Sequence, residues 1–405
     1  MNDIFHSMFM TRMLFSALVD ADFLDTESFM SSGKKKRNRY DSIEELVMKL
    51  DDKLKVFSNP SNEINQIRYS ILQQCLNASN IDGKIFSLTV PTGGGKTWSS
   101  MAFALHHAKR FNKERVIYVI PFTSIIEQTV DVFRSVFGEG NVLEHHSNVD
   151  YASLKEGESE DFLKKSSENW DIPIIVTTNV QFFESLFAYK TSKCRKLHNI
   201  ANSVIVFDEA QMLPIQYLKP CTRMISELTQ NCRDTVLLCT ATQPNLQRFF
   251  GDNEIHEIIH SPAELFIKLK RTKIEIEGKC EVRELVEKIK EYKQVLCIVN
   301  LKKRAYELFH EFECDHVFHL STNMTPNHRR EVLAVIRKRL NEGLPSIVIS
   351  TTVLEAGVDI DFPVVFRECA GLDSILQAAG RCNREGKRKA EDSCLRCRSP
   401  RGNVD

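Results

Sequence analysis

The chain has 405 residues, which is too long for one ordinary hydrophobic core, so we expect two or three domains. Its formal net charge is +0, so a strong basic field over the whole surface is excluded, and any contact with nucleic acid must be local. No segment approaches the roughly 18 consecutive apolar residues that a membrane span needs. The N-terminus lacks the features of a secretory signal, so we expect a cytoplasmic protein with reduced cysteines.

The N-terminal part is predicted to be helical. Apolar residues recur at helical spacing over 4–30, and a polar basic run follows at 31–40. Such a run is typical of a solvated linker, with a nucleic-acid contact as the alternative. Two further helices are expected near 41–57 and 63–77.

From residue 84 onward, short apolar runs alternate with helical patterns. This rhythm predicts parallel sheets with helices on both faces, arranged as two α/β lobes with a boundary around 255–272. The first lobe is expected at 41–265, with strands at 85–90, 115–120, 172–176, 203–207 and 235–240. The second is expected at 266–387, with strands at 273–276, 294–299, 316–319, 346–350 and 363–366.

Residues 388–405 show no apolar periodicity. We therefore expect a disordered tail or an out-of-frame end, which would leave the second lobe without its last strand and with an exposed sheet edge. The tail contains one pair of cysteines with two residues between them, Cys394 and Cys397. One such pair cannot complete a zinc site with four ligands, so no metal is expected there.

A glycine-rich segment, PTGGGKT at 91–97, lies between an expected strand and an expected helix, which is the setting of a phosphate-binding loop. Its glycines allow backbone N–H groups to turn toward an anion, and the helix N-terminus adds partial positive charge. Lys96 would bind the β- and γ-phosphates of ATP, and Thr97 would ligate Mg²⁺. A glycine-rich turn without ligand is the alternative. The candidate ATP-binding residues are Pro91, Thr92, Gly93, Gly94, Gly95, Lys96 and Thr97.

Two carboxylates follow the apolar strand predicted at 203–207. Asp208 and Glu209 stand at the carboxyl end of a parallel strand, where ligands bind in such sheets. We expect Asp208 to hold Mg²⁺ and Glu209, as a catalytic residue with Lys96, to orient the water that attacks the γ-phosphate. Gln211 can sense that phosphate, or the TAT segment at 240–242, by hydrogen bonding. The alternative is an acidic pair that caps the next helix.

The second lobe offers two arginines with helical spacing. Gln377, Arg381 and Arg384 share one face of a short predicted helix. Guanidinium groups so placed suit arginine fingers, which are worth roughly 10³–10⁵ in rate. The spacing therefore predicts two lobes that act on one ATP, with closure tied to hydrolysis. A solvated basic helix end is the alternative.

Further polar residues lie just after expected strands. In STTVLEAGVD at 350–359, Gly357 allows a tight turn and Asp359 can bond a ribose or relay closure of the lobes, so both are candidate ATP-binding residues. Hydroxyl groups and helix N-termini at strand ends would hold a nucleic-acid strand by its phosphates rather than its bases. For each threonine, helix capping is the alternative. The candidates for nucleic-acid binding are Pro121, Thr123, Ser124, Gln128, Thr177, Thr178, Thr351 and Thr352.

Taken in order, these segments resemble a superfamily 2 helicase, and more narrowly the CRISPR-associated helicase–nucleases of type I systems. The matching segments are PTGGGKT, PFTSIIEQT (121–129), LEHHSN (143–148), VFDEAQMLP (206–214), TATQPNL (240–246) and QAAGRCNREG (377–386). The resemblance covers about residues 60–387, and the DEAQ variant points to the type I-C branch.

The resemblance implies two tandem RecA-like lobes that use ATP and Mg²⁺. It further implies an ATP-dependent translocase on the displaced single DNA strand of an R-loop, recruited by an RNA-guided surveillance complex. We expect a monomer without membrane contact.

The N-terminal helix resembles the last helix of that family's metal-dependent HD nuclease domain, so 1–40 would be a remnant of it. Asp22, or otherwise Asp20, would match the final metal ligand. The histidines and the HD pair of such a site are missing from the sequence, and one carboxylate cannot hold a metal for strand cleavage. We therefore predict no nuclease activity, and we expect this chain to be a fragment of a longer protein.

Two other functions stay open. One is a non-catalytic fragment that binds ATP and still docks on a surveillance complex. The other is an RNA helicase of the same superfamily, because nothing in these motifs distinguishes a DNA backbone from an RNA backbone.

Overall fold

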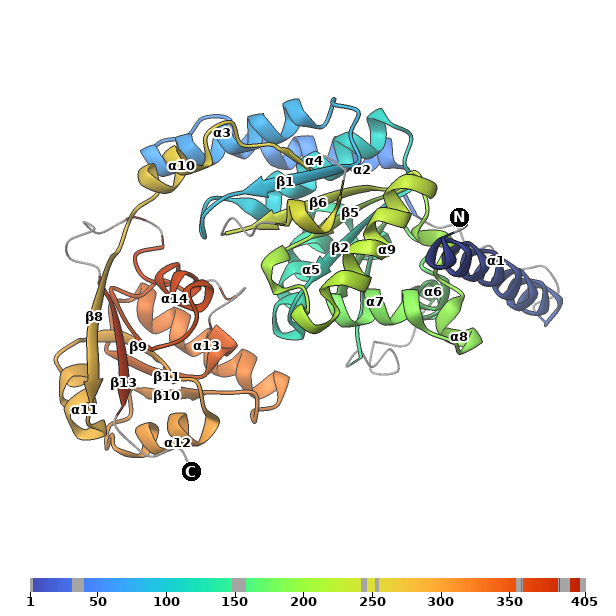
Figure 1. Cartoon of the computed structure of the whole chain (residues 1–405). Coiled ribbons are helices and arrows are strands. Elements are labelled where there is room, and N and C mark those ends of the chain that lie inside the picture. The colour runs from blue at the N-terminus through green and yellow to red at the C-terminus, as the bar shows by residue number, and fades with distance from the viewer. Residues whose placement is uncertain are drawn as a thin grey trace. The chain divides into compact units, whose positions relative to one another are not determined.

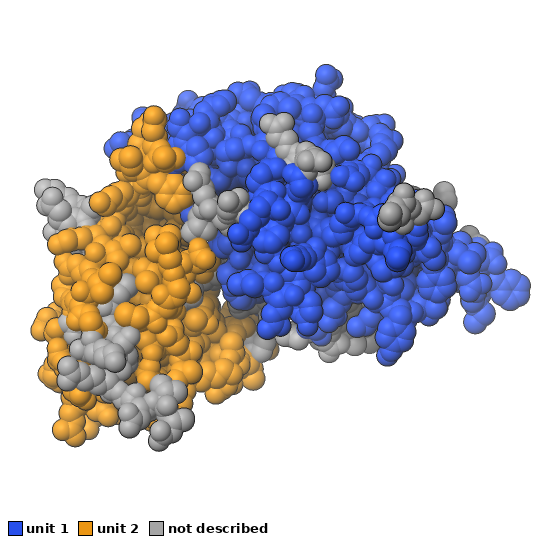
Figure 2. Space-filling model, viewed as in Figure 1, with its two compact units in different colours: residues 1–90, 95–262 blue, residues 91–94, 263–405 orange. Residues whose placement is uncertain are grey.

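The computed structural model describes residues 3–30, 40–147, 158–241, 246–251, 255–354, 358, 360–384, 386 and 394–400. The chain forms two compact units, a first unit of residues 1–90 and 95–262 and a second unit of residues 91–94 and 263–405 (Figure 2). Each unit contains one parallel sheet with helices packed against it, so the two α/β lobes predicted from the alternating pattern are confirmed (Figure 1).

The first sheet has seven strands in the order β3-β4-β2-β5-β6-β1-β7. They are β1 (Ile85–Thr89), β2 (Arg115–Ile120), β3 (Val142–His145), β4 (Ile174–Thr178), β5 (Ser203–Phe207), β6 (Thr235–Thr240) and β7 (Ile255–Glu257). The helices of this unit are α1 (Ile4–Met30), α2 (Ile43–Leu54), α3 (Glu63–Ala78), α4 (Lys96–Arg110), α5 (Thr123–Phe137), α6 (Glu158–Asn169), α7 (Asn179–Phe187), α8 (Thr191–Cys194) and α9 (Leu218–Asn231). Among the described residues, no helix is long and apolar enough to cross a membrane.

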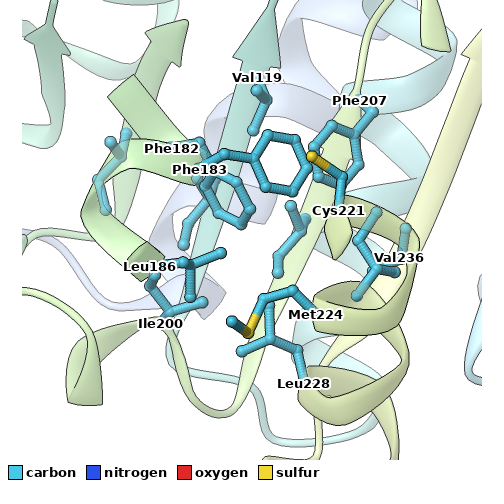
Figure 3. Packing of buried hydrophobic residues seen from close by; sticks show 14 of the residues in the cluster. Val119, Phe182, Phe183, Leu186, Ile200, Phe207, Cys221, Met224, Leu228 and Val236 are labelled. Carbon is cyan, nitrogen blue, oxygen red and sulfur yellow. The ribbon is translucent and has the colours of Figure 1, made fainter. Parts of the chain in front are cut away.

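Both faces of this sheet are buried, because its central strands are apolar on both sides. On one face Tyr118 of β2 bonds to Ser100 of α4 and packs edge-on against Phe133 of α5. The other face packs against α7 and α9. Figure 3 shows the rings of Phe182 and Phe207 in that layer, where their centroids lie 5.4 Å apart. Burial of this kind favours strands that are mainly apolar, and Asp208 and Glu209 follow the carboxyl end of β5.

The N-terminal helix α1 is part of the first unit. Phe9 and Met13 belong to the same apolar cluster as Phe182 and Leu228, so α1 packs into the core of this unit. Buried polar bonds fasten the helix as well, including one from the Ser16 hydroxyl to the Cys194 carbonyl oxygen at 2.6 Å. Its helical apolar pattern therefore reflects packing against this unit.

The second sheet has six strands in the order β10-β11-β9-β12-β13-β8. They are β8 (Lys273–Cys280), β9 (Gln294–Ile298), β10 (Val317–Leu320), β11 (Ser346–Ser350), β12 (Val364–Glu368) and β13 (Cys394–Pro400). Helices α11 (Val282–Lys290) and α12 (Lys302–His310) cover one face, and α13 (Pro326–Asn341) and α14 (Leu372–Ala379) cover the other. The short helix α10 (Pro262–Lys268) begins at the last residue of the first unit.

The expectation of a wholly disordered tail and a missing last strand is wrong. Strand β13 lies inside the sheet, paired with β12 on one side and with β8 on the other. Leu395 is buried in the apolar cluster beneath α13 and α14, and Arg396 pairs with Glu275 and Glu277 of β8. The sequence pattern does not reveal this strand, because Cys394–Pro400 has no apolar alternation and Arg396 finds its carboxylate partners on a strand that is distant in the sequence.

Candidate nucleotide-binding site

The glycine-rich segment forms a loop between β1 and α4. The Val90 N–H donates to the Thr240 carbonyl oxygen at 3.0 Å, and the Val90 side chain is fully buried, so the strand end accommodates this residue where such loops usually have Gly or Ala. Gly93 and Gly95 adopt φ values of +78° and +87°, which L side chains rarely adopt. Helix α4 begins at Lys96, so its unpaired N–H groups lie directly after the loop.

Four side chains from three segments form one hydrogen-bonded chain. The Lys96 Nζ lies 3.1 Å from the Glu209 Oε1, and both side chains are mostly buried. Gln211 donates to the other Glu209 oxygen at 2.6 Å and accepts from the Thr240 hydroxyl at 2.8 Å. The expected hydrogen bond between Gln211 and the TAT segment is therefore present. The loop lysine, the acidic segment and the end of β6 are thus linked side chain to side chain.

Asp208 follows the carboxyl end of β5, in surroundings that disfavour its ionised form. Burial and the neighbouring Glu209 carboxylate raise the pKa of Asp208 to about 6, although the Lys96 ammonium acts in the opposite direction. The Asp208 Oδ1 accepts the Glu209 N–H at 3.1 Å. A cation beside Asp208 would favour its ionised form.

The residues expected to hold Mg²⁺ fit that ion by their chemistry. Thr97, in the first turn of α4, offers a hydroxyl group. Asp208 offers a carboxylate whose ionised form Lys96 alone does not stabilise enough to offset burial and the charge of Glu209. Hard oxygen ligands of this kind, completed by water and phosphate, are what Mg²⁺ prefers.

The three candidate residues of the second unit are placed differently from one another. The Gln377 side chain, on α14, is buried, and its amide nitrogen has no hydrogen-bond partner among the described residues. Arg381 is also buried, and its guanidinium donates to the Val358 carbonyl oxygen at 2.7 Å. Arg384 is more exposed, and its backbone N–H is held by Asp361 at 2.7 Å. Arg384 is therefore the arginine better placed to meet a ligand.

Some predicted residues cannot be placed. Gly357 and Asp359 lie outside the described residues, as does Thr242 of the TAT segment. Thr123 and Ser124 lie in the first turn of α5, after Pro121 and one further residue, and only their backbone is described. Their position at the carboxyl end of β2 is the one expected from the sequence.

Two predicted hydroxyl groups in the first unit have bonds within the protein. Thr177 is fully buried, and its hydroxyl donates to the His145 carbonyl oxygen at 2.7 Å. Thr178 caps α7 by accepting the Gln181 N–H at 3.0 Å, which is the capping alternative considered for each threonine. Gln128 lies farther along α5 and is half-buried. The N-terminal turns of α5 and α7 follow β2 and β4 at this edge.

In the second unit the strand ends gather more polar groups than the sequence indicated. Thr351 is buried and its N–H donates to the Leu320 carbonyl oxygen, whereas Thr352 is exposed. Lys302, in the first turn of α12, donates to the Asn323 Oδ1 at 2.9 Å. Lys302 and Asn323 follow β9 and β10, the strands next to β11, and the strand-end criterion used for Thr351 would have found them.

The two aspartates proposed for a nuclease remnant have opposite environments. Asp22 is exposed on α1. Asp20 is buried, 2.8 Å from the Arg195 Nε and 3.1 Å from the Asn169 amide nitrogen. Within the described part of the chain, no three His, Cys, Asp or Glu side chains gather as a metal site would require.

Comparison with known proteins gives matches over most of the chain. Residues 66–249 match a family model described as DEAD/DEAH box helicase, and residues 291–387 match one described as CRISPR-associated nuclease/helicase Cas3, C-terminal. A CRISPR-associated nuclease/helicase Cas3 of Haloferax volcanii is 24% identical over 74% of this chain and 44% of its own length. The Methanothermobacter thermautotrophicus protein of the same name is 28% identical over 73% of this chain and 38% of its own length.

A crystal structure of T. fusca Cas3-ATP superimposes with a TM-score of 0.67 at 17% identity, over 88% of this chain and 48% of that one. That likeness supports the fold. The chain thus spans less than half the length of these relatives. The two model matches and the relatives show that residues 66–249 are similar to DEAD/DEAH box helicases and that residues 291–387 are similar to the C-terminal part of the CRISPR-associated Cas3 nuclease/helicases.

Proposed function

We propose that this chain is an ATP-driven translocase on single-stranded DNA that works with an RNA-guided surveillance complex. The observation that carries the ATPase part is the hydrogen-bonded chain from Lys96 through Glu209 and Gln211 to Thr240. It joins a phosphate-binding lysine to a carboxylate able to act as a general base, and it ends at a neighbouring strand. The DNA substrate and the complex rest on similarity to proteins named CRISPR-associated nuclease/helicases.

In this proposal the phosphates of ATP replace Glu209 as the partner of the Lys96 ammonium. The triphosphate draws the ammonium away from Glu209, whose carboxylate stays held by Gln211. Glu209 is then able to orient a water molecule and accept its proton as the γ-phosphate is attacked. Mg²⁺ held by Thr97 and Asp208 would neutralise charge on the phosphates.

The second unit would supply positive charge to the transition state. Arg384 is the proposed finger, because its side chain is more exposed than that of Arg381. Arg381 and Gln377 are buried, and we assign them to holding the segment that carries Arg384. Turnover would then depend on both units, as translocation requires.

Nucleic acid would be held by its phosphates at the strand ends. In the first unit the proposed contacts are the N-terminal turns of α5 and α7, which carry Thr123, Ser124 and Thr178. In the second unit they are Thr352 with Lys302 and Asn323. Contacts of this type fix the path of a strand without reading its sequence.

The test is ATP hydrolysis by the full chain with and without single-stranded DNA. We expect stimulation by DNA, and a loss of about 10²–10³-fold in turnover for Lys96→Ala, because the lysine contacts charge that develops in the transition state. Lys109→Ala is the matched control, since Lys109 lies exposed at the far end of the same helix. Equal rates with and without DNA would reject the translocase proposal.

The same assay separates the alternatives. ATP binding without turnover would favour the non-catalytic fragment. Competition between DNA and RNA strands of one sequence would separate a DNA translocase from an RNA helicase, because only a contact to the 2′-hydroxyl distinguishes the two backbones. The chain is proposed to lack nuclease activity, because its one exposed candidate ligand, Asp22, has no metal-binding cluster around it among the described residues.

A further inference from the structure

A tyrosine of the central strand β2 carries a polar group into the buried layer beneath α4. Tyr118 is fully buried, and its ring packs edge-on against Phe133 of α5 with the two centroids 5.3 Å apart. A phenylalanine would fill the same space, so this packing does not account for the hydroxyl group. The Tyr118 hydroxyl lies 3.0 Å from the Oγ of Ser100, which is also fully buried. A buried hydroxyl is costly unless it is bonded, and this bond joins α4 to the sheet.

The hydrogen bonds continue from Ser100 to a residue expected to ligate Mg²⁺. The Ser100 Oγ donates to the Thr97 carbonyl oxygen at 3.1 Å, near the start of α4. Because a serine hydroxyl has one proton, Tyr118 is the donor in the bond between the two hydroxyl groups. Burial and, after it, the Asp208 carboxylate raise the pKa of Tyr118 well above its usual value, so Tyr118 keeps the proton that it donates. The bonds therefore run from β2 through Ser100 to the backbone of Thr97.

The same tyrosine lies beside the strand that leads to the second expected ligand. Tyr118 pairs with Val206 of β5, and the Asp208 N–H donates to the Val119 carbonyl oxygen at 2.8 Å. Successive side chains of a strand alternate between the two faces of a sheet. Asp208 stands two positions after Val206, so its side chain belongs to the face that carries Tyr118 and α4. Strand β2 is thus bonded both to the strand before Asp208 and to the helix turn that carries Thr97.

We propose that Tyr118 is a positioning residue for the Mg²⁺ site and sets the spacing between Thr97 and Asp208 through its bond to Ser100. This inference rests on the proposed ATPase function. Tyr118 is not itself a ligand, because its proton is donated to Ser100. Mg²⁺ demands a near-ideal octahedron with ligands at about 2.0–2.1 Å, whereas Ca²⁺ accepts flexible arrangements at about 2.3–2.6 Å. A fixed spacing between the two protein ligands therefore matters more for Mg²⁺ than for Ca²⁺.

The experiment measures, by calorimetry, binding of the full chain to AMPPNP, an ATP analogue that is not hydrolysed. It is done with Mg²⁺, with Ca²⁺ and with a chelator, because the ratio of the affinities with and without metal gives the contribution of the ion. We expect Tyr118→Phe to reduce the gain from Mg²⁺ on the order of tenfold, the range found for residues that orient metal ligands. The gain from Ca²⁺ should fall less, and the affinity in chelator should change less than about twofold.

ATP turnover gives a second readout, because a positioning role changes the dependence on Mg²⁺ more than the maximal rate. Half-maximal turnover in Tyr118→Phe should need on the order of tenfold more Mg²⁺. The rate at saturating Mg²⁺ should stay within about threefold of that of the unsubstituted chain. A general loss of folded protein would instead lower the maximal rate and leave the dependence on Mg²⁺ unchanged.

A second variant breaks the same link at its other end. Ser100→Ala should reduce the gain from Mg²⁺ as Tyr118→Phe does, and the double variant should lose no more than either single variant. Ser167→Ala is the matched control, since Ser167 of α6 is a buried serine that also donates to the carbonyl oxygen three residues earlier. This control should leave the gain from Mg²⁺ unchanged.

Other results would overturn the proposal in identifiable ways. An unchanged gain from Mg²⁺ in both Tyr118→Phe and Ser100→Ala would mean that the link serves the fold alone. An equal loss of affinity with Mg²⁺, with Ca²⁺ and with chelator would assign Tyr118 to the structure of the phosphate-binding loop. Losses that add in the double variant would contradict a shared path through Ser100.

The same titrations separate this inference from the function on which it rests. Lys96→Ala should weaken AMPPNP binding in chelator as well as with metal, if the loop binds phosphates. Retained binding in Lys96→Ala would reject the nucleotide site itself. Loss in Lys96→Ala together with an unchanged gain from Mg²⁺ in Tyr118→Phe would reject only the role of Tyr118.

Discussion

Glu209 combines an unusual backbone with a fixed side chain. Its φ of +50° lies in the left-handed region, which costs of order 1 kcal/mol for a residue other than glycine. Its two carboxylate oxygens are bonded to Lys96 and Gln211. Backbone conformations of this kind persist where the surrounding structure over-determines them, and they cluster at functional sites. The surrounding structure therefore fixes Glu209 in the conformation that its proposed role would use.

Asp208 should make stability depend on pH in a direction opposite to that of most surface carboxylates. Burial and Glu209 raise its pKa to about 6, so the folded chain binds a proton more tightly than the unfolded chain. Without nucleotide, ionised Asp208 therefore destabilises the fold, and stability falls as pH rises from about 4 to 6. Asp208→Asn should stabilise the chain by about 1–2 kcal/mol at pH 7.5, after allowance for partial solvent screening, and by roughly half as much at pH 5.

Urea unfolding of both forms at the two pH values measures this difference. If Asp208→Asn stabilised the chain more at pH 5 than at pH 7.5, that result would contradict the direction of the pKa shift. The same substitution should abolish Mg²⁺-dependent ATP turnover, since an amide is a poor substitute for the carboxylate expected to hold the ion.

At the scale of elements, α1 is anchored by a buried ion pair. Asp20 pairs with Arg195 of the segment after α8, and Arg195 also pairs with Glu168 of α6 at 2.6 Å. Asp20→Ala should destabilise the chain by about 3–5 kcal/mol, because it removes the buried partner of a buried guanidinium. Asp22→Ala is the matched control, two residues along the same helix but exposed, and should change stability by less than about 0.5 kcal/mol.

Chemical denaturation with urea at neutral pH compares the two variants. A larger loss for Asp22→Ala would contradict this account of how α1 is held, and would indicate an interaction at the exposed face of the helix.

Strand β13 gives a second prediction at this scale. Leu395 is fully buried among residues of β9, β11, β12 and α14, so Leu395→Ala should cost about 2–5 kcal/mol by leaving a cavity. The loss should appear in the unfolding transition of the second unit, followed for example by hydrogen exchange in β12, the strand beside it. Unchanged protection of β12 would mean that residues 394–400 contribute nothing to the sheet.

The elements also show what the sequence could and could not reveal. Strands β5 and β11 were predicted to the residue, because a fully buried strand shows a continuous central run of apolar residues. The three-residue strand β7 is too short to show a period, and β13 is held by backbone pairing and by charge neutralisation of Arg396. The rule that ligands bind beyond the carboxyl ends of parallel strands singled out Lys96, Asp208 and Glu209.

The same logic could not tell accessible hydroxyl groups from occupied ones. The Thr177 hydroxyl is taken by the carbonyl oxygen of His145, 32 residues away in the chain, a partner that no local pattern indicates. A contact between Arg68 and Gly95 was missed for the same reason, because the two residues are 27 positions apart and β1 lies between them in the sequence.

For the molecule as a whole, the proposed chemistry is divided between the two units. The first unit holds the lysine, the two carboxylates and Gln211 in one bonded chain, and this chain is complete without the second unit. The second unit carries Arg384 on a segment fixed to Asp361. Binding of ATP should therefore use Lys96 of the first unit together with the loop residues 91–94, while its hydrolysis should also need Arg384.

The central claim is that Arg384 acts on ATP bound by Lys96, and the measurement that tests it most directly compares ATP affinity with turnover in Arg384→Ala. Affinity should stay within about threefold of that of the unsubstituted chain, while DNA-stimulated turnover falls by roughly 10³-fold or more. Arg283→Ala, an exposed arginine of α11, should change neither. Turnover of Arg384→Ala equal to that of the unsubstituted chain would contradict the claim.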